Sequence, residues 1–148
     1  MEEYWVKRDF SKTPEPRGEV KEAQGRLYVV QEHHASRLHW DLRLERDGVL
    51  ASWAVPKGVP EERGTRRLAV RTEDHPVEYA DFQGTIPKGE YGGGTITIWD
   101  SGVFEAEKWR DEEIIVHLNG GRLNGRFCMI GLKGKEGNWL LFRCGKDE

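Results

Sequence analysis

Residues 39–55 read HWDLRLERDGVLASWAV, two strand-like segments that flank a short turn. From His39 to Glu45 polar and apolar side chains alternate strictly, a period of two that is typical of a β-strand with one buried face. Asp47-Gly48 is a strong two-residue hairpin turn. The sequence therefore predicts two antiparallel strands here, the second over Val49–Val55.

Short strand-like segments continue along the rest of the chain. Helical periodicity is scarce, and the best helical candidate, about Lys108–Glu113, is short and polar. Together with 18 glycines, this pattern predicts a mainly β protein, either a small β-barrel or a β-sandwich. The other expected strands are Arg26–Gln31, Arg67–Thr72, Thr95–Trp99, Val103–Ala106, Ile114–Leu118, Arg126–Ile130 and Asn138–Arg143.

Two segments depart from the strand pattern. We expect a single domain over residues 1–148, in which residues 1–24 form an extended N-terminal arm because proline and glycine recur there. A long loop is expected over residues 74–94, and its aromatic residues and Ile86 indicate that it packs on the domain. His75 precedes a proline, so its backbone is expected to be extended and its imidazole to project from this loop.

The composition is that of a small protein of 148 residues without a membrane span, because no apolar run exceeds four residues. The N-terminal residues do not resemble a secretory signal, and we expect a cytoplasmic monomer. The two cysteines, Cys128 and Cys144, lack the spacing of a thiolate metal site and are expected to be buried free thiols.

Charge is unevenly distributed along the chain. The net charge of −3 argues against indiscriminate binding to nucleic acid through bulk charge. However, residues 57–71 are rich in lysine and arginine, and residues 105–113 in aspartate and glutamate. A local basic patch on an acidic body fits the binding of one phosphate-bearing end, and the alternative is that both segments are ordinary solvated surface.

The polar face of the first strand contains candidate metal ligands. Side chains two residues apart on a strand share a face, about 6.7 Å apart at Cα, so His39 and Asp41 can converge on one ion. His33, where the preceding strand ends, can supply a third ligand. Mixed imidazole and carboxylate ligands suit manganese, iron or zinc, although such a trio is alternatively solvated surface. His34 and His117 are expected to be surface or packing residues.

Cationic residues nearby suit an anion. Arg43 continues the polar face of the strand and can reach an oxygen bound to the metal, and its planar guanidinium matches phosphate. Lys57 and Arg67 can add donors, although exposed basic residues at strand ends are common. His75 can act as a proton donor or a phosphate ligand, and Tyr79 follows four residues later.

These motifs belong to longer segments that occur in order and with intact spacing. The segments are Lys7–Pro16, Gln31–Glu45, Ser52–Gly58, Glu73–Phe82 and Ile86–Gly92. Together they resemble the 3′-phosphoesterase domain of bacterial DNA ligase D over roughly residues 4–102, and more loosely to the end of the chain. The polymerase and ligase domains of the full-length family are absent, so we expect either a free-standing version or an excised domain.

The resemblance implies a manganese-dependent enzyme, with other divalent transition metals as substitutes. It also implies that the mainly β fold is a small closed or partly open antiparallel β-barrel with few short helices and a long active-site loop. Family members remove a 3′-phosphate, or trim a terminal ribonucleoside, from DNA or RNA-tipped primer-template 3′ ends. A DNA ligase or polymerase acting in trans is an expected partner. The implied metal ligands are His33, His39 and Asp41; the implied catalytic residues are Arg43, His75 and Tyr79; the implied phosphate contacts are Arg43, Lys57, Arg67 and His75; and Gln31 and Glu73 match positions that orient the ligands.

The favoured hypothesis is phosphoester hydrolysis in DNA repair and end joining. Arg43, helped by Lys57 and Arg67, would clamp the phosphate oxygens. His75 would hydrogen-bond the phosphate or protonate the leaving oxygen.

Two rival functions use the same residues. A facial-triad Fe(II) oxygenase would need room for a co-substrate and fewer cations near the metal. A non-catalytic module that binds 3′ ends would keep the metal for structure.

Overall fold

The computed structural model describes residues 1–18 and 26–145, so that residues 19–24 of the expected arm lie outside the described residues. None of the helices in the described part is long and apolar enough to cross a membrane. In chain order, the elements are α1 (Glu2–Val6), β1 (Leu27–His34), β2 (Leu38–Arg46), β3 (Val49–Val55), β4 (Arg66–Pro76), the 3₁₀ helix η1 (Val77–Asp81), β5 (Gly84–Ile86), β6 (Gly94–Trp109), β7 (Glu113–Gly120), β8 (Asn124–Gly131) and β9 (Asn138–Arg143).

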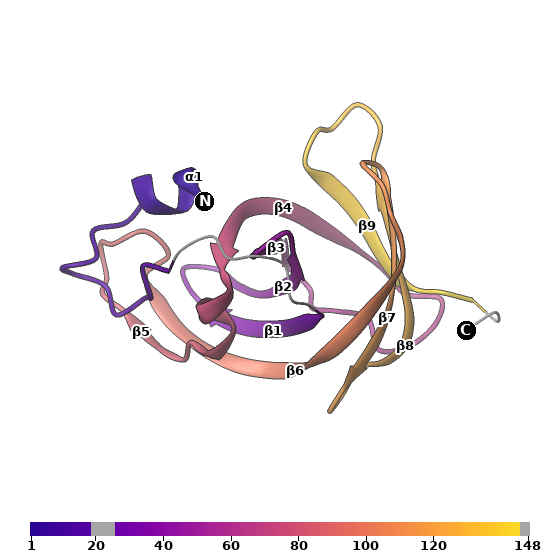
Figure 1. Cartoon of the computed structure of the whole chain (residues 1–148), viewed down its shortest axis with the longest axis horizontal. Helices are drawn as coiled ribbons and strands as arrows, with labels where there is room; N and C mark the ends of the chain where they lie inside the picture. The colour runs from indigo at the N-terminus through magenta and orange to yellow at the C-terminus, as the bar shows by residue number, and fades with distance from the viewer. Residues whose placement is uncertain (19–25, 146–148) are drawn as a thin grey trace.

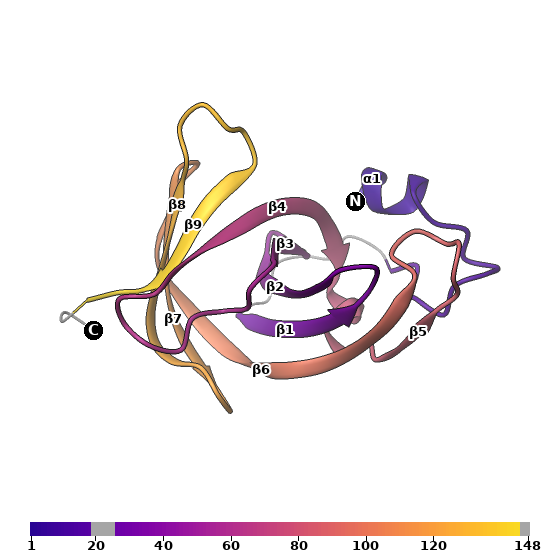
Figure 2. The ribbon, with the colours of Figure 1, turned by 180° about the vertical axis from the view of Figure 1, so that it is seen from behind.

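The nine strands of the described residues form one antiparallel sheet, in the order β1-β2-β3-β4-β9-β8-β7-β6-β5. β1 also pairs with β6, so eight strands close into a barrel and β5 lies as an extra strand along β6 (Figure 1). Figure 2 shows the same arrangement from behind, with α1 and β5 at one end of the molecule and β8 and β9 at the other. The expected antiparallel β-barrel is therefore confirmed, and it is closed.

The β2–β3 hairpin has the turn that the sequence predicts. Arg46 pairs with Val49 across Asp47 and Gly48, and these two turn residues have φ angles of 53° and 84°. Positive φ at both central positions is typical of a type I′ turn, whose twist matches that of the paired strands. The turn therefore sets the register that orients every side chain of β2.

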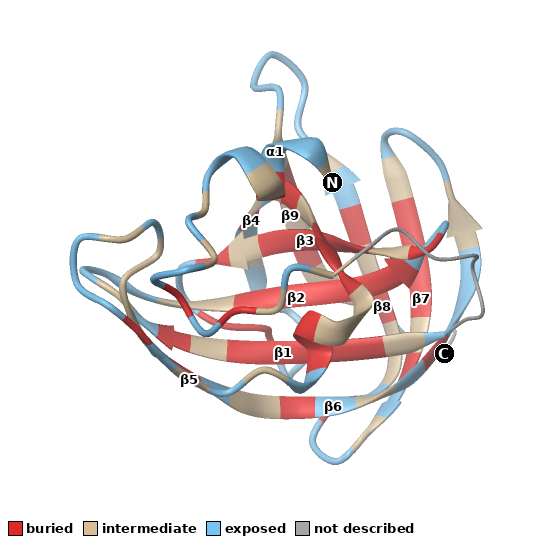
Figure 3. Ribbon diagram, turned by 60° about the vertical axis from the view of Figure 1, so that its left-hand side comes forward, coloured by how far each residue is buried: buried red, intermediate tan, exposed pale blue. Residues whose placement is uncertain are grey.

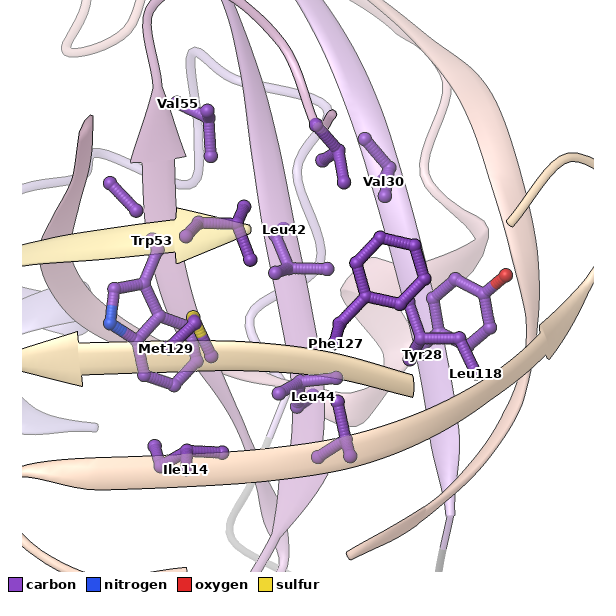
Figure 4. Close-up of a cluster of buried hydrophobic side chains, with 14 of the residues drawn as sticks. Tyr28, Val30, Leu42, Leu44, Trp53, Val55, Ile114, Leu118, Phe127 and Met129 are labelled. Carbon is purple, nitrogen blue, oxygen red and sulfur yellow. The ribbon is translucent and has the colours of Figure 1, made fainter. Parts of the chain in front are cut away.

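The barrel interior holds the main hydrophobic core. Leu42 and Leu44 of β2 point into it and are 2% and 0% exposed, as the alternating pattern predicted. Figure 4 shows them among side chains from β1, β3, β7 and β8. Trp53 of β3 is fully buried there and meets Trp139 edge-on. Because the apolar half of β2 faces inward, its polar half faces the outside of the barrel wall.

A second apolar cluster lies on that outer side. Side chains of α1, η1 and β5 pack there against β1, β3 and β6, so that part of the wall is covered (Figure 3). The polar residues of β1 and β2 next to this cover are sequestered from water, although they lie outside the barrel. The cluster consists of Tyr4, Val29, Leu50, Tyr79, Ala80, Ile86 and Ile96.

Three local structures differ from the expectation. The arm begins with a short helix, α1, instead of extended chain. Lys108–Glu113 is not helical but comprises the end of β6, the connection 110–112 and the start of β7, because Trp109 and Ile114 pair across this hairpin and both pack on the core. Cys128 and Cys144 form a disulfide rather than two free thiols, since the pairing of β8 with β9 brings their Cα atoms to 5.7 Å.

The expected long loop over residues 74–94 consists partly of ordered elements. β4 extends to Pro76, so His75 lies on a strand and is 4% exposed, instead of projecting from a loop. η1 and β5 follow, and Ile86 packs in the outer cluster as expected.

Candidate metal centre and anion pocket

Three candidate metal ligands meet on the outer wall of the barrel. In the β1–β2 pair, His33 lies directly opposite His39, and Asp41 follows two residues later on the same face of β2. One ligand atom from each residue lies within 4.8 Å of the other two. His39 Nε2 and His33 Nδ1 are 3.3 and 3.7 Å from Asp41 Oδ2. The structure therefore brings together, on one hairpin, the three ligands that the sequence predicted.

Backbone carbonyl groups determine which imidazole nitrogens face this centre. His33 Nε2 lies 2.7 Å from the carbonyl oxygen of Gly92, and His39 Nδ1 lies 3.1 Å from that of Arg37. A carbonyl oxygen only accepts, so each of these nitrogens carries a proton and donates. On a neutral ring the opposite nitrogen is then unprotonated, and in both residues it faces Asp41. Metal ligation requires this tautomer, so the donor set fits a divalent transition metal.

The charges around Asp41 favour its ionised form. Burial alone would raise the pKa of Asp41, but the Arg43 guanidinium and the neighbouring imidazoles of His33 and His39 hold it well below its usual value. Burial opposes protonation of His39, yet its hydrogen bond and attraction to Asp41 raise the pKa of His39 above its usual value. A proton therefore competes with a metal ion for His39.

Arg43 lies beside these ligands with a side chain that is 4% exposed. Its Nε donates to Gln31 Oε1 at 2.7 Å, and its Nη2 lies 3.5 Å from Asp41 Oδ2. Gln31 donates in turn to the carbonyl oxygens of Tyr79 and Phe82, so it links Arg43 to η1. Arg43 Nη1 is buried without a hydrogen-bond partner among the described residues. Because such a group is costly to leave unpaired, its position favours an anionic ligand.

His75 faces the same pocket from β4. Its Nδ1 donates to the carbonyl oxygen of Glu73 at 2.9 Å, which leaves Nε2 as an acceptor, 3.4 Å from Arg8 Nη2. Burial, together with the charges of Arg43 and Arg8, lowers the pKa of His75 well below its usual value. The imidazole is therefore neutral at neutral pH.

The N-terminal arm completes the pocket through Arg8, which the sequence analysis did not single out. Arg8 joins two buried carboxylates: its Nε donates to Glu15 Oε2 at 2.9 Å and its Nη1 to Glu73 Oε2 at 3.2 Å. Glu73, expected to orient the metal ligands, thus anchors the arm. Arg8 and Glu15 belong to the segment Lys7–Pro16, and its resemblance to the family is the signal that could have pointed to them.

Tyr79 supports the pocket from η1. Its hydroxyl donates to Glu15 Oε2 at 2.6 Å, and the Arg43 guanidinium lies 4.8 Å from the centre of its ring. Burial raises the pKa of Tyr79 well above its usual value, and the negative charge of Glu15 adds to this. Tyr79 therefore remains protonated and positions its neighbours.

These groups line one pocket of about 320 Å³. It joins the metal ligands to Arg43, His75 and the arm. The lining residues are Arg8, Glu15, His33, Ala35, His39, Asp41, Arg43, Ala54, Thr72, Glu73, His75, Tyr79, Ile86, Tyr91 and Gly92.

Lys57 and Arg67, which the sequence analysis placed with Arg43, lie elsewhere. They line a separate hollow together with Trp40 and Trp99. Arg67 Nη1 donates to the carbonyl oxygens of Lys57 and Gly58. The structure therefore does not bring these two cations to the metal ligands. His34 is exposed and His117 is half-buried, and they pair with Glu32 and Glu107, in agreement with the expectation of surface or packing residues.

The closed barrel and its pocket define a class of protein: a small β-barrel with a two-histidine, one-carboxylate centre beside an arginine-lined anion pocket. Over residues 31–131 the chain matches the family model described as the DNA ligase D 3′-phosphoesterase domain. This protein therefore belongs to the DNA ligase D 3′-phosphoesterase domain family.

Similar proteins support the same family. The multifunctional non-homologous end joining protein LigD of Mycolicibacterium smegmatis is 54% identical over 158 residues, which cover 98% of this chain and 20% of that protein. The protein of the same name from Pseudomonas aeruginosa is 46% identical over 158 residues, covering 100% and 19%. The multifunctional non-homologous end joining DNA repair protein LigD of Mycobacterium tuberculosis H37Rv is 52% identical over 142 residues, covering 92% and 18%. The chain thus spans about a fifth of the length of these relatives.

Proposed function

We propose that this chain is a metal-dependent phosphoesterase that heals the 3′ ends of nucleic acids during repair by end joining. One observation carries the proposal: Arg43 holds a buried N–H without a partner beside a preformed set of metal ligands. Phosphate suits this arrangement, because its oxygens accept from guanidinium groups and also bind divalent ions. The family and the end-joining relatives support the 3′ end of a nucleic acid as the source of that phosphate.

We propose Mn²⁺ as the ion, with other divalent transition metals as substitutes. His33, His39 and Asp41 would hold it, since imidazole and carboxylate together suit such ions. When bound, the ion supplies positive charge that stabilises charge developing on the phosphate oxygens. Three protein ligands leave positions for water or a substrate oxygen.

The protein side chains would bind the phosphate and move a proton. Arg43 Nη1 would donate to one phosphate oxygen, and Arg8 would face another from the arm. The bound anion would offset the two guanidinium charges that lower the pKa of His75. His75 would then gain a proton and hydrogen-bond the phosphate, or protonate the leaving sugar oxygen. Tyr79 and Gln31 would keep Arg43 in place.

The proposed reactions are removal of a 3′-phosphate and trimming of a 3′-terminal ribonucleoside. DNA or RNA-tipped primer-templates are the proposed partners, with a ligase or polymerase in trans and the cytoplasm as the proposed location. Lys57 and Arg67 would contact the nucleic acid outside the metal pocket, because their hollow is separate from it.

The test is a gel assay on a labelled primer-template that ends in a 3′-phosphate or in one ribonucleotide. Each substrate is incubated with manganese, magnesium, zinc or a chelator. We expect manganese-dependent conversion to a 3′-hydroxyl, loss of that conversion in His39→Ala, and its retention in His117→Ala, a matched change at a half-buried histidine that pairs with Glu107. Full activity in His39→Ala would refute the proposed metal centre.

Two further measurements separate the rival functions: binding of the 3′-phosphate primer and consumption of oxygen. Tight binding of a 3′-phosphate end without turnover under any metal would favour the non-catalytic module. Oxygen consumption with a 2-oxoacid would favour the Fe(II) oxygenase. The guanidinium groups of Arg43 and Arg8 in the pocket count against that oxygenase, which would need fewer cations near its metal.

A further inference from the structure

We infer that Tyr91 is the platform on which the base of the 3′-terminal nucleotide stacks, so that the pocket prefers strands whose last nucleotide carries a base. The inference rests on the proposed function, because it assumes that the reacting phosphate lies beside Arg43.

Tyr91 lines the pocket of about 320 Å³ that holds the candidate metal ligands and Arg43, and it lies in a loop next to Gly92. The next residue is Gly92, whose carbonyl oxygen accepts the hydrogen bond of the metal ligand His33, so the loop is tied to the wall of the centre. Gly92 has a φ angle of 76°, a left-handed conformation that glycine adopts without strain. The amide of Gly93 donates to the carbonyl oxygen of Glu90 at 3.0 Å and closes a turn around Tyr91.

The ring of Tyr91 remains open to solvent at this position. Tyr91 is 47% exposed, whereas Tyr79, the other tyrosine that lines the pocket, is 1% exposed and has its hydroxyl bound to Glu15. Of the two tyrosines, Tyr91 is therefore the one exposed enough to meet a base that extends out of the pocket.

Two cations of the arm hold this ring. Lys7 Nζ and Arg8 Cζ lie 4.8 and 5.2 Å from its centroid, and Lys7 also donates to the hydroxyl of Tyr91 at 3.3 Å. A base that stacks here thus meets a ring already fixed in place, which limits the entropy lost on binding. Aromatic rings beside cationic grooves bind nucleic-acid ends with little sequence preference, because every base has a flat π face.

The space around the loop fits a strand that leaves the pocket past Tyr91. An adjoining hollow of about 550 Å³ is lined mainly by residues of the glycine-rich loop 88–94. Ala35, Ile86 and Gly92 border both this hollow and the metal pocket. A phosphate held by Arg43 can therefore be the end of a strand whose last sugar and base extend toward the rim.

The experiment compares two primer-templates that end in a 3′-phosphate, one with a normal terminal nucleotide and one with an abasic terminal nucleotide. Binding is measured by fluorescence anisotropy with a chelator present, so that no strand is hydrolysed. The proteins are wild type, Tyr91→Phe, Tyr91→Leu and Tyr91→Ala, each checked by its melting curve. A second readout is the fluorescence of 2-aminopurine as the terminal base, which falls on stacking.

For the wild type and Tyr91→Phe, we expect the base to strengthen binding about tenfold. For Tyr91→Leu and Tyr91→Ala, we expect the two strands to bind equally and 2-aminopurine to stay bright. Since leucine retains an apolar side chain without a ring, the comparison of Tyr91→Phe with Tyr91→Leu decides the matter even if Tyr91→Ala does not fold. A preference for the base that survives in Tyr91→Leu, or its absence in the wild type, would overturn the inference.

The proposed function fails separately. A wild-type protein that shows the base preference but hydrolyses neither substrate with any metal would refute the phosphoesterase and leave the stacking role intact. Hydrolysis without any base preference would refute the stacking role alone.

Discussion

Replacing Arg43 tests how the pocket holds its anion. The three nitrogens of the guanidinium differ in their surroundings: Nε donates to Gln31 at 2.7 Å, Nη2 lies 3.5 Å from Asp41 Oδ2, and Nη1 has no hydrogen-bond partner among the described residues, so that the proposal assigns it to the phosphate. Arg43→Lys keeps the charge but has one ammonium group in place of these three nitrogens. One lost charge-assisted hydrogen bond is worth about 1.5–3 kcal/mol, which corresponds to a loss of about 10- to 150-fold in kcat/KM. Arg43→Met also removes the charge and should cost about 100- to 1000-fold.

The assay is steady-state hydrolysis of the 3′-phosphate primer with manganese, together with the manganese affinity of each variant by calorimetry. Arg43→Met should bind manganese at least as tightly as the wild type, because a positive charge near Asp41 has been removed. The loss of activity would then lie in phosphate binding, since the metal is retained. Activity of Arg43→Met within threefold of the wild type would refute this reasoning, as would a loss explained entirely by weaker manganese binding.

Three further changes test the site. His39→Ala should weaken manganese binding in calorimetry by more than about tenfold, whereas His34→Ala on the exposed side should not; equal affinities would contradict the ligand assignment. Arg8→Met should lower the free energy of unfolding in urea by about 3–5 kcal/mol, because Glu73 loses its buried partner, and a change below about 1 kcal/mol would show that the arm adds little. The pKa of His75 is lowered in the folded state, so the unfolded state binds more protons below about pH 6.5 and stability should fall as the pH drops from there. Urea unfolding of His75→Gln should lack this part of the pH dependence.

The barrel could be predicted from local patterns, but the exact extent of its strands could not. Val49–Val55 and Asn138–Arg143 match the bounds of β3 and β9, and each begins directly after a turn-favouring residue, Gly48 and Gly137 respectively. Thr95–Trp99 and Val103–Ala106 are instead one strand, β6, which crosses a glycine and pairs with both β1 and β7. β6 is continuous because β1 pairs with its first half and β7 with its second half. A local sequence pattern does not predict such pairing with distant strands.

The same distinction applies to the site. That His33, His39 and Asp41 come together could be predicted, because they share one face of one hairpin. Arg8 and Glu15 could not be assigned a role, because the arm contributes to the pocket through contacts with residues far away in the sequence. Periodicity predicts local strands and helices but not such distant contacts. Lys57 and Arg67 were placed with Arg43 because they are basic residues at expected strand ends and match phosphate contacts of the family, but the structure puts them in another hollow.

The β1–β2 hairpin, which holds His33, His39 and Asp41, and the anion pocket around Arg43 are expected to form at different stages of folding. All three candidate metal ligands lie between His33 and Asp41, so a single turn and a few strand pairs suffice to assemble them. The anion pocket requires the arm, β2, β4 and η1 to meet, which places residues as far apart as Arg8 and His75 in contact. Local contacts form before distant ones in most chains. A nascent or partly unfolded chain could thus capture its ion early and acquire the ability to hold phosphate only when the last segments have docked.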